Sequence, residues 1–205
     1  MIAIISVLAA MLFPVFARAR AKAEQTACES NLKELALATT MYCDDYDDTY
    51  PISWNTTANL GFNWSTAIYS YVKNLQVYNC PASGHTALWS AVGSGFGRYA
   101  NVLQADYGEN GCLGSMGGGN GCGPGANHWL WPITQGAVQH PSSMIMIFGT
   151  NAPAFTFTNP DAPGTPNLET RHFSGGNVAF CDGHADWLSQ PVLYATDGSA
   201  GWDNN

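Results

Sequence analysis

The chain has little charge, and the charge it has is unevenly spread. Charged residues make up 11% of its 205 residues, less than half the usual share in soluble domains. Seven Lys and Arg residues stand against 15 Asp and Glu residues, which gives a formal net charge of −8. Phosphate binding requires clustered Lys and Arg side chains. The composition therefore predicts no nucleic-acid partner.

Residues 1–17 lack charge altogether, and Ser6 is their only polar side chain. A secretory signal carries positive charge before its apolar run and a small-residue cleavage site after it. Here the positive residues Arg18, Arg20 and Lys22 follow the run. A membrane-spanning helix needs roughly 20 apolar residues, so this run is slightly short. Neither a signal peptide nor a complete membrane span accounts for it alone.

Recognisable enzyme motifs are also missing. The sequence has no nucleophile elbow, metalloprotease helix, P-loop or dinucleotide-binding fingerprint. Its glycine-rich stretch at 114–121 lacks the Lys of a phosphate-binding loop. We therefore expect a protein that is not an enzyme. A remote alternative is a membrane-anchored, metal-dependent enzyme that uses His172, Asp182 and His184.

Cysteine spacing argues against a structural zinc site, because no C-x2-C pair occurs. The six cysteines are Cys28, Cys43, Cys80, Cys112, Cys122 and Cys181. An even number in a low-charge chain with an export-like start favours disulfides formed in an oxidising compartment. The alternative is that several of these cysteines are buried free thiols.

Residues 2–45 are predicted to form one long helix, because Ala, Leu, Met, Lys, Glu and Gln dominate and Gly is missing. Pro14 should kink this helix. The helix is apolar on every side up to Phe16 and becomes amphipathic beyond Arg18. We expect these side chains to face a core: Ala27, Leu32, Leu35, Leu37 and Met41. Such a helix spans roughly 65 Å, about twice the diameter of a small domain, so its first third must be buried in lipid or in other protein.

The rest of the chain predicts a head of mixed helix and strand. We expect a helix at 65–75, a strand or edge segment at 76–81, a loop at 108–125 and strands at 142–150 and 154–158. Two five-residue runs, NVAFC and HADWL, flank Asp182-Gly183, the preferred pair for a two-residue type I′ hairpin. The predicted fold class is α+β, with a long amino-terminal helix kinked near Pro14 and packed on a head with an antiparallel β-sheet. We divide the chain into the helix, residues 1–50, and the globular head, residues 51–205.

Both ends of the sequence resemble the type IV pilin and type II secretion pseudopilin superfamily. Residues 2–51 are similar to its amino-terminal helix, including Pro14. Residues 171–188, RHFSGGNVAFCDGHADWL, resemble the carboxy-terminal H-x9-DG signature of bacterial prepilin-type proteins, with His172 ten positions before Asp182. VYNCPAS, at 77–83, resembles a Cys-Pro-Ser-like segment of such chains. The resemblance implies a pilin-like fold.

The start of the sequence departs from this resemblance. Superfamily members share a basic leader, a Gly-Phe cleavage site and a Glu soon after it. This sequence has none of these, and its resemblance, aligned on Pro14, implies a start about eight residues inside the usual mature amino terminus. The two explanations are a truncated gene model and a lineage that has dispensed with leader processing. We expect truncation, because the missing residues would complete a membrane span and a basic leader would satisfy the positive-inside rule.

The resemblance also implies the function that we expect, which is the major structural subunit of an extracellular type IV pilus-like filament. Its partners would be copies of itself in a helical homopolymer, the inner membrane before assembly, the pilus assembly machinery and prepilin peptidase. The alternative is a pseudopilin or minor pilin of a type II secretion-type machine. The residues expected in the filament core are Ile2, Ile4, Ile5, Val7, Leu8, Met11, Leu12, Phe13, Pro14 and Phe16.

Two clusters are candidate sites for calcium or another divalent cation, and no other cofactor is expected. One comprises the carboxylates Asp44, Asp45, Asp47 and Asp48 at the end of the long helix. They lack the Gly and distal Glu of an EF-hand loop, so a solvated acidic turn is the alternative. The other comprises His172, Asp182 and His184, since two imidazoles and a carboxylate can bind a metal. Its alternative is a hairpin turn with a structural histidine.

Three disulfides are predicted. Cys112 and Cys122 lie in one glycine-rich loop that folds back easily. Cys28 and Cys43 stand about 22 Å apart along the helix, beyond the roughly 7 Å between α-carbons that a disulfide allows. If either forms a disulfide, its partner must lie in the head. The resemblance implies the pair Cys43–Cys181, because Ala is expected at both positions in the family. That leaves Cys28 with Cys80.

Overall fold

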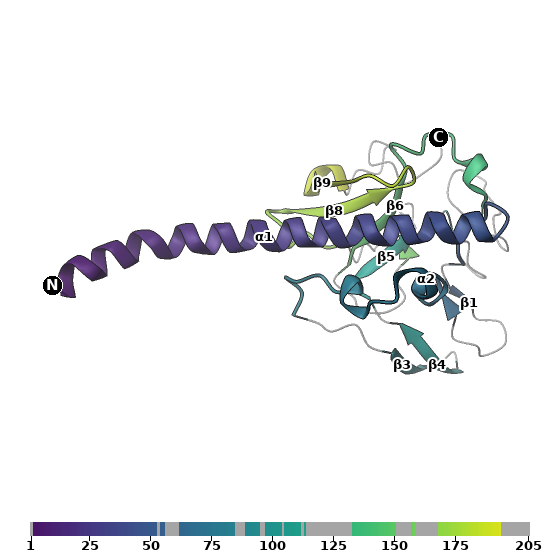
Figure 1. The fold of residues 1–205 in the computed structure, drawn as a ribbon, viewed down its shortest axis with the longest axis horizontal. Coiled ribbons are helices and arrows are strands. Elements are labelled where there is room, and N and C mark those ends of the chain that lie inside the picture. Colours follow the sequence, from purple (N-terminus) through teal and green to yellow (C-terminus); the bar gives the residue numbers. More distant parts are fainter. Residues whose placement is uncertain are drawn as a thin grey trace.

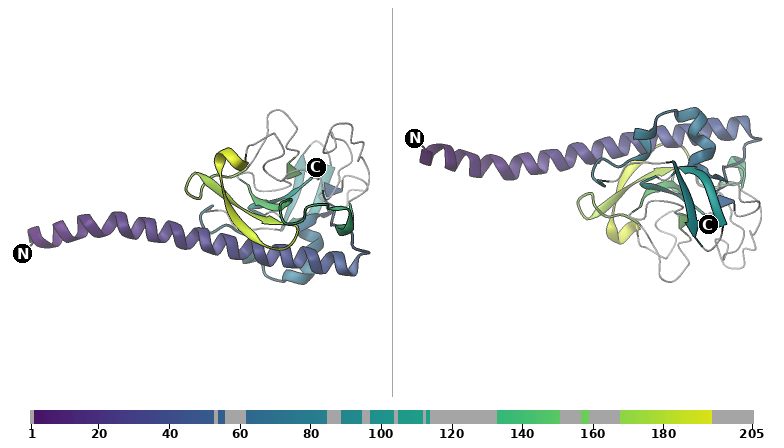
Figure 2. Two further views of the ribbon diagram at one scale, coloured as in Figure 1. Left: turned by 90° about the horizontal axis from the view of Figure 1, so that it is seen from above. Right: turned by 90° about the horizontal axis from the view of Figure 1, so that it is seen from below.

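The molecule is a long helix that carries a head on its carboxy-terminal part (Figure 1). In this computed structural model the described residues are 2–52, 54–55, 62–84, 89–94, 97–103, 105–111, 113, 133–150, 157–158 and 168–193. The amino-terminal part of the helix projects away from the head in all three ribbon views (Figures 1 and 2). The α+β fold predicted from the sequence is confirmed.

Helix α1, Ile2–Asp45, is one continuous helix of 44 residues with Pro14 inside it. The projecting part curves, and no break interrupts it at Pro14 (Figure 1). Its good helix formers and its lack of Gly explain its length. The predicted bounds of this helix are therefore confirmed.

The buried stripe of α1 differs in part from the predicted one. Leu32 and Leu35 are fully buried as expected, but Leu37 is 60% exposed and Met41 is 45% exposed. Ala27 is exposed as well. A helix turns roughly 100° per residue, which places these three on the far side from the stripe that packs on the head. The buried residues of α1 are Gln25, Cys28, Leu32, Leu35, Ala36, Ala38, Thr39 and Cys43.

A five-stranded sheet lies against α1, in the order β7-β5-β6-β8-β9. Strands β5 (Tyr107–Asn110), β6 (Ile145–Gly149), β8 (Gly175–Phe180) and β9 (Ala185–Ser189) pair antiparallel, whereas β7 (Phe157–Thr158) pairs parallel to β5. The antiparallel sheet was predicted; Gly108–Asn110, expected in a loop, belongs to β5 instead. Strands β6, β8 and β9 contact α1.

The smaller elements lie around this core. Helix α2, Trp64–Val72, confirms the helix predicted at 65–75 and packs on α1; the side chain of Asn63 accepts the Thr66 backbone N–H at its start. Residues 76–81 do not form the expected strand, because the Asn74 side chain accepts the Gln76 backbone N–H and begins a 3-10 turn. The remaining elements are β1 (Trp54–Asn55), β2 (Phe62–Asn63), η2 (Leu75–Tyr78), β3 (Trp89–Ser94), β4 (Gly97–Leu103), η3 (Gln135–Ala137) and α3 (Gln190–Leu193).

The β8–β9 hairpin does not have the predicted two-residue turn. The Phe180 N–H donates to the His184 carbonyl, and the Gly183 N–H donates to the Phe180 carbonyl. This makes a three-residue loop in which Gly183 has φ +90° and Asp182 keeps a negative φ, whereas a type I′ turn needs positive φ at both central residues. The Asp182 carboxylate accepts the His184 backbone N–H instead, which favours the observed loop.

Two hydrophobic clusters form the core of the described residues. The larger one joins α1 and α2 to the sheet and contains the fully buried Trp64, Tyr78 and Leu113. The smaller one brings β6, β8 and α3 together through Phe148, Val178 and Leu193. The head is therefore packed against the carboxy-terminal half of α1, and the projecting part contributes nothing to either cluster.

Candidate functional site

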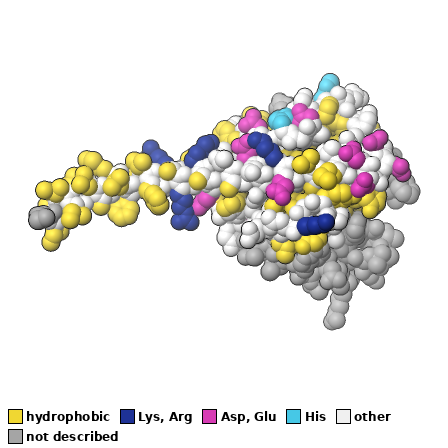
Figure 3. Space-filling model, in the orientation of Figure 1, with side chains coloured by type: hydrophobic (Ala, Val, Ile, Leu, Met, Phe, Trp, Pro, Cys, Tyr) yellow, Lys and Arg dark blue, Asp and Glu magenta, His cyan; other side chains and the backbone are white. Residues whose placement is uncertain are grey.

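The projecting part of α1 exposes a continuous apolar surface, which we call the apolar segment and define as residues 2–17 (Figure 3). Ser6, its polar side chain, donates to the Ile2 carbonyl over 3.0 Å and so presents no free donor. The large side chains of the segment are 56% to 83% exposed. These residues are Ile2, Ile4, Ile5, Val7, Leu8, Met11, Leu12, Phe13, Val15 and Phe16. Every large side chain predicted for a filament core is thus on the surface of the single chain.

One side of the apolar segment is hollowed. The hollow lies between the large side chains of Leu12, Phe13 and Phe16, with small residues at both of its ends. The residues that line it are Ala9, Leu12, Phe13, Val15, Phe16 and Ala19. No charged group lines it, so its chemistry suits lipid chains or the apolar side chains of another helix.

A basic collar, Arg18, Arg20 and Lys22, separates the apolar segment from the head (Figure 3). The Arg20 Nε lies 2.8 Å from Glu24 Oε1, and Lys22 Nζ donates to Gln25 Oε1 over 2.9 Å. Both contacts follow the i,i+3 and i,i+4 spacing of neighbours on a helix. They hold the collar side chains along α1 at the point where the apolar surface ends.

The helix is attached to the head directly after the collar. Gln25 is buried, and its carbonyl accepts the Asn177 Nδ2–H over 2.8 Å. Asn177 lies in the middle of β8 and is itself 1% exposed. Because buried hydrogen bonds fix geometry, the direction of the apolar segment is tied to that of the sheet.

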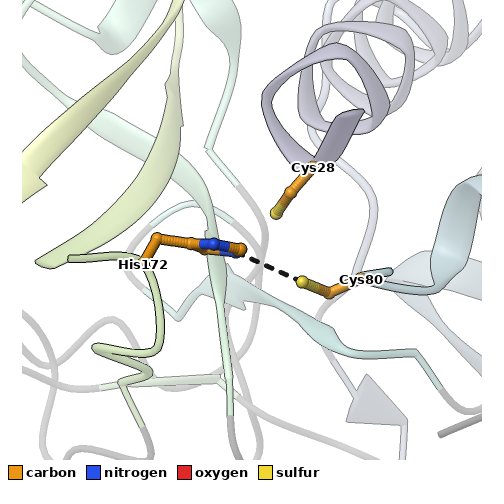
Figure 4. Close-up of side chains that lie close together, drawn as sticks. All are labelled: Cys28, Cys80 and His172. Carbon is orange, nitrogen blue, oxygen red and sulfur yellow. Dashed lines mark hydrogen bonds between the residues drawn. The ribbon is translucent and has the colours of Figure 1, made fainter. Parts of the chain in front are cut away.

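A second candidate site lies between α1 and the head, where Cys28, Cys80 and His172 meet (Figure 4). They come from α1, from the segment after η2 and from the segment before β8. Cys80 Sγ lies 3.3 Å from His172 Nε2. The two sulfur atoms and one ring nitrogen all lie within 4.8 Å of one another, and the residues are 2%, 2% and 5% exposed.

Neighbouring groups complete this cluster. The Tyr107 hydroxyl donates to Cys28 Sγ over 3.4 Å. The hydrogen bond to Cys28, together with burial, raises the pKa of Cys80 well above that of an ordinary thiol. The cluster is therefore buried, and its donors are of the soft type that thiophilic metals prefer.

The histidines of the carboxy-terminal signature do not come together. His184 Nδ1 lies 2.5 Å from Asp182 Oδ1, and the His184 ring stacks on Phe180 with centroids 4.2 Å apart. His172 joins Cys28 and Cys80 instead. Within the described ranges, His172, Asp182 and His184 do not form a group with ligand atoms this close.

The acidic residues at the end of α1 are exposed. Asp45 accepts the Tyr71 hydroxyl over 2.7 Å, and Asp47 and Asp48 have φ of 52° and 57° in the turn that follows. In the described part of the chain, no three of the carboxylates Asp44, Asp45, Asp47 and Asp48 bring ligand atoms within 4.8 Å of one another. Calcium binding at this turn stays a prediction.

The disulfide predictions have different outcomes. Cys28 and Cys80 are brought together, but they are free thiols in this structure, as are Cys43 and Cys181. Burial raises the pKa of Cys181 to about 12, which keeps it protonated at neutral pH. The pairings Cys28–Cys80 and Cys43–Cys181 stay predictions. Cys112 and Cys122 lie outside the described residues.

The sequence did not indicate the Cys–Cys–His cluster. Its members stand at 28, 80 and 172, with none of the short spacings that mark common zinc sites. One feature of the sequence could have indicated the cluster. Cys28 lies on the amphipathic part of the helix, Cys80 lies in VYNCPAS, and His172 lies in the carboxy-terminal signature. All three thus lie in the segments that carry the resemblance.

Comparison with known proteins gives one match. Residues 17–86 match the model of a family described as a protein of unknown function (DUF1559), which is associated with pilin-like and prepilin-type proteins. No curated protein and no solved structure matches the chain. The matched range contains the collar, the packed part of α1, α2 and both Cys28 and Cys80. The carboxy-terminal signature lies outside it.

Proposed function

We propose that this chain is a structural subunit of an extracellular type IV pilus-like filament, assembled through the apolar segment of α1. The observation that carries the proposal is the exposure of that segment: ten large apolar side chains are each more than half exposed in the single chain. Soluble monomers rarely expose contiguous apolar patches of this kind unless they bind a partner or a membrane.

The energy of the exposed surface supports this assignment. Burying a large apolar side chain contributes roughly 1.5–3 kcal/mol, so the ten together contribute on the order of 10 kcal/mol or more. That is comparable with the whole free energy of unfolding of a domain, about 5–15 kcal/mol. The segment will therefore be found in lipid or in protein. α1 is long and apolar enough to cross a membrane, which suits an inner-membrane anchor before assembly.

Assembly would then move the apolar segment from lipid into a bundle of identical helices. Lipid tails are as apolar as Leu side chains, so this step gains little from the hydrophobic effect and depends on close packing between helices. The hollow between Leu12 and Phe16 offers a place for such packing. The collar would mark the boundary between the dry bundle and the heads, which would face outward. The pilus assembly machinery and prepilin peptidase are the further partners that the resemblance implies.

A pseudopilin or minor pilin of a type II secretion-type machine is the alternative function. It would use the same apolar segment but would not form long fibres. Abundance separates the two, because a major subunit dominates the protein sheared from the cell surface. We propose no catalytic role for the chain.

A pair of phenylalanine substitutions tests the proposal. Phe13, in the apolar segment, is 71% exposed, and Phe173, on the head, is 51% exposed, so Phe13→Asp and Phe173→Asp disturb no packed core. An Asp at the centre of an apolar helix costs about 3 kcal/mol in lipid. We expect Phe13→Asp to reduce the chain in sheared fibres at least tenfold and Phe173→Asp to leave it unchanged, measured by immunoblot of cells that carry the assembly machinery.

Fractionation of the same cells locates the step that fails. Loss of the Phe13→Asp chain from both membrane and fibre fractions would place the defect at insertion, and loss from fibres alone would place it at assembly. Equal incorporation of both variants into fibres would contradict the proposed function.

A further inference from the structure

We propose that Cys28, Cys80 and His172 bind one thiophilic metal ion, Zn²⁺ or Cu⁺. This site is separate from the apolar segment that the proposed filament role uses, because it lies where the packed part of α1 meets the head. The first support is the donor set. Two thiol groups and an imidazole are the ligands that soft and borderline d10 cations prefer, whereas calcium and magnesium prefer oxygen.

The distances between donors fit a single ion. Ligands at about 2.3 Å for sulfur and 2.0–2.1 Å for nitrogen stand roughly 3.6–3.8 Å apart around a tetrahedral zinc ion. Here Cys80 Sγ and His172 Nε2 are 3.3 Å apart, and all three donors lie within 4.8 Å of one another. Side-chain rotations that change each donor–donor distance by about 1 Å or less would bring all three donors onto one ion. The three side chains converge on the same point from three directions (Figure 4).

The backbone of each of the three donor residues is fixed by a different structural element or set of hydrogen bonds. Cys28 lies in α1, and the Cys80 backbone N–H donates to Asp106 Oδ2 over 2.9 Å. The backbone of His172 exchanges two hydrogen bonds with Gly175, and its carbonyl also accepts the Trp187 Nε1–H over 2.7 Å. Donors fixed in this way lose little conformational entropy on binding. A bound ion would connect α1 directly to the head.

Burial and charge favour the same ion. Two thiolates in a dry interior are costly without compensation, and Zn²⁺ neutralises both of them. The Tyr107 hydroxyl, 3.4 Å from Cys28 Sγ, is placed to hydrogen-bond a metal-bound thiolate from the second shell, as metal sites commonly require. Tyr107 is itself 2% exposed and receives the Asn31 Nδ2–H.

The competing state is a Cys28–Cys80 disulfide, which uses the same two sulfur atoms. A disulfide leaves the ring of His172 without a role, whereas a metal site uses its Nε2. The two states therefore differ in the number of free thiols and in their dependence on His172.

Metal titration of the full chain tests the proposal. The chain is purified in detergent with its thiols reduced and without oxygen, and is then titrated with Zn²⁺ or Cu⁺ in competition with a chromogenic chelator for each ion. We expect one equivalent of one of these ions to bind and to raise the Tm. Cys28→Ser, Cys80→Ser and His172→Asn should each weaken binding at least tenfold. Cys43→Ser and Cys181→Ser are the matched controls, because they remove buried or partly buried thiols elsewhere in the core, and they should bind as the unaltered chain does.

Cobalt substitution gives a readout that needs no variant. Co²⁺ bound by Cys28 and Cys80 in the unaltered chain should show thiolate-to-metal charge-transfer absorption, which zinc then displaces. If the reduced chain binds neither Zn²⁺ nor Cu⁺, or if a chain that binds Zn²⁺ shows no thiolate bands with cobalt, the proposal is wrong. Binding that survives His172→Asn unchanged would also overturn it. So would a Cys28–Cys80 disulfide in metal-free chain isolated from cells, identified by peptide mapping without reduction.

Discussion

At the residue scale, the turn beside His172 stores backbone strain. Phe173 and Ser174 have φ of 53° and 58°, and His172 and Gly175 exchange both of their backbone hydrogen bonds across them. This is the positive-φ geometry of a two-residue hairpin turn, which Asn and Gly favour. A non-glycine residue in this region costs about 1–2 kcal/mol. Such strain is found where a structure fixes a functional side chain, and here the turn fixes His172.

Glycine in place of Ser174 should relieve this strain. Ser174→Gly should raise the free energy of unfolding by about 0.5–1 kcal/mol, because the relief of strain exceeds the added entropy of the unfolded chain. Gly183→Ala, at φ +90° with open space around its α-carbon, should lower it by a similar amount for the opposite reason. Denaturant unfolding of the full chain in detergent, followed by Trp fluorescence, measures both changes. The same sign of change for both variants would contradict the strain argument.

The sequence predicted which residue types could bind a metal better than it predicted which of them lie together. His172 was recognised as a candidate ligand, but Asp182 and His184 were expected beside it because they are close in the sequence. The structure pairs Asp182 with His184 and places His172 near two cysteines that stand 92 and 144 positions before it. Contacts at such separation depend on how α1 and the sheet pack, which one sequence does not reveal.

At the scale of the element, α1 combines two surfaces in one helix. Residues 2–17 have no contacts with the head, and the helix from Gln25 onward buries one stripe against it. The exposed Leu37 and Met41 lie on the opposite side of the packed part.

Two leucines of α1 give a matched test of the buried stripe. Leu32 is fully buried and Leu37 is 60% exposed, so the same substitution removes packing in one case only. Leu32→Ala should lower the free energy of unfolding by about 2–5 kcal/mol, and Leu37→Ala should change it by less than about 0.5 kcal/mol. Denaturant unfolding in detergent measures both. Similar losses would show that the stripe is not where the structure has it.

Sequence patterns predicted elements where local chemistry dominates. The bounds of α1 follow from helix propensity, and the β8–β9 hairpin follows from two apolar runs around a turn. The buried face of α1 was predicted incorrectly at Ala27, Leu37 and Met41. The buried stripe of α1 contains Cys28, Thr39 and Cys43. A prediction that counts only strongly apolar residues as core does not find such a stripe. The turn at Leu75–Tyr78 was missed because one Asn side chain determines it.

At the scale of the whole molecule, the projecting helix and the head differ in charge. The segment before the collar has no charge, the collar is basic, and residues 34–205 hold 13 of the 15 acidic residues. An uncharged shaft with acidic heads suits an assembly that is dry inside and solvated outside. Close packing of acidic heads should be favoured by salt, since salt screens their repulsion.

Electron microscopy of surface fibres, with and without the apolar segment, tests the central claim most directly. Cells that carry the assembly machinery would produce either the full chain or the chain without residues 1–17, and the sheared fraction would be imaged and probed with antibody to the head. The account predicts fibres labelled along their length for the full chain, and a soluble monomer with no labelled fibres for the shortened chain. Labelled fibres of the same form from the shortened chain would contradict assembly through α1.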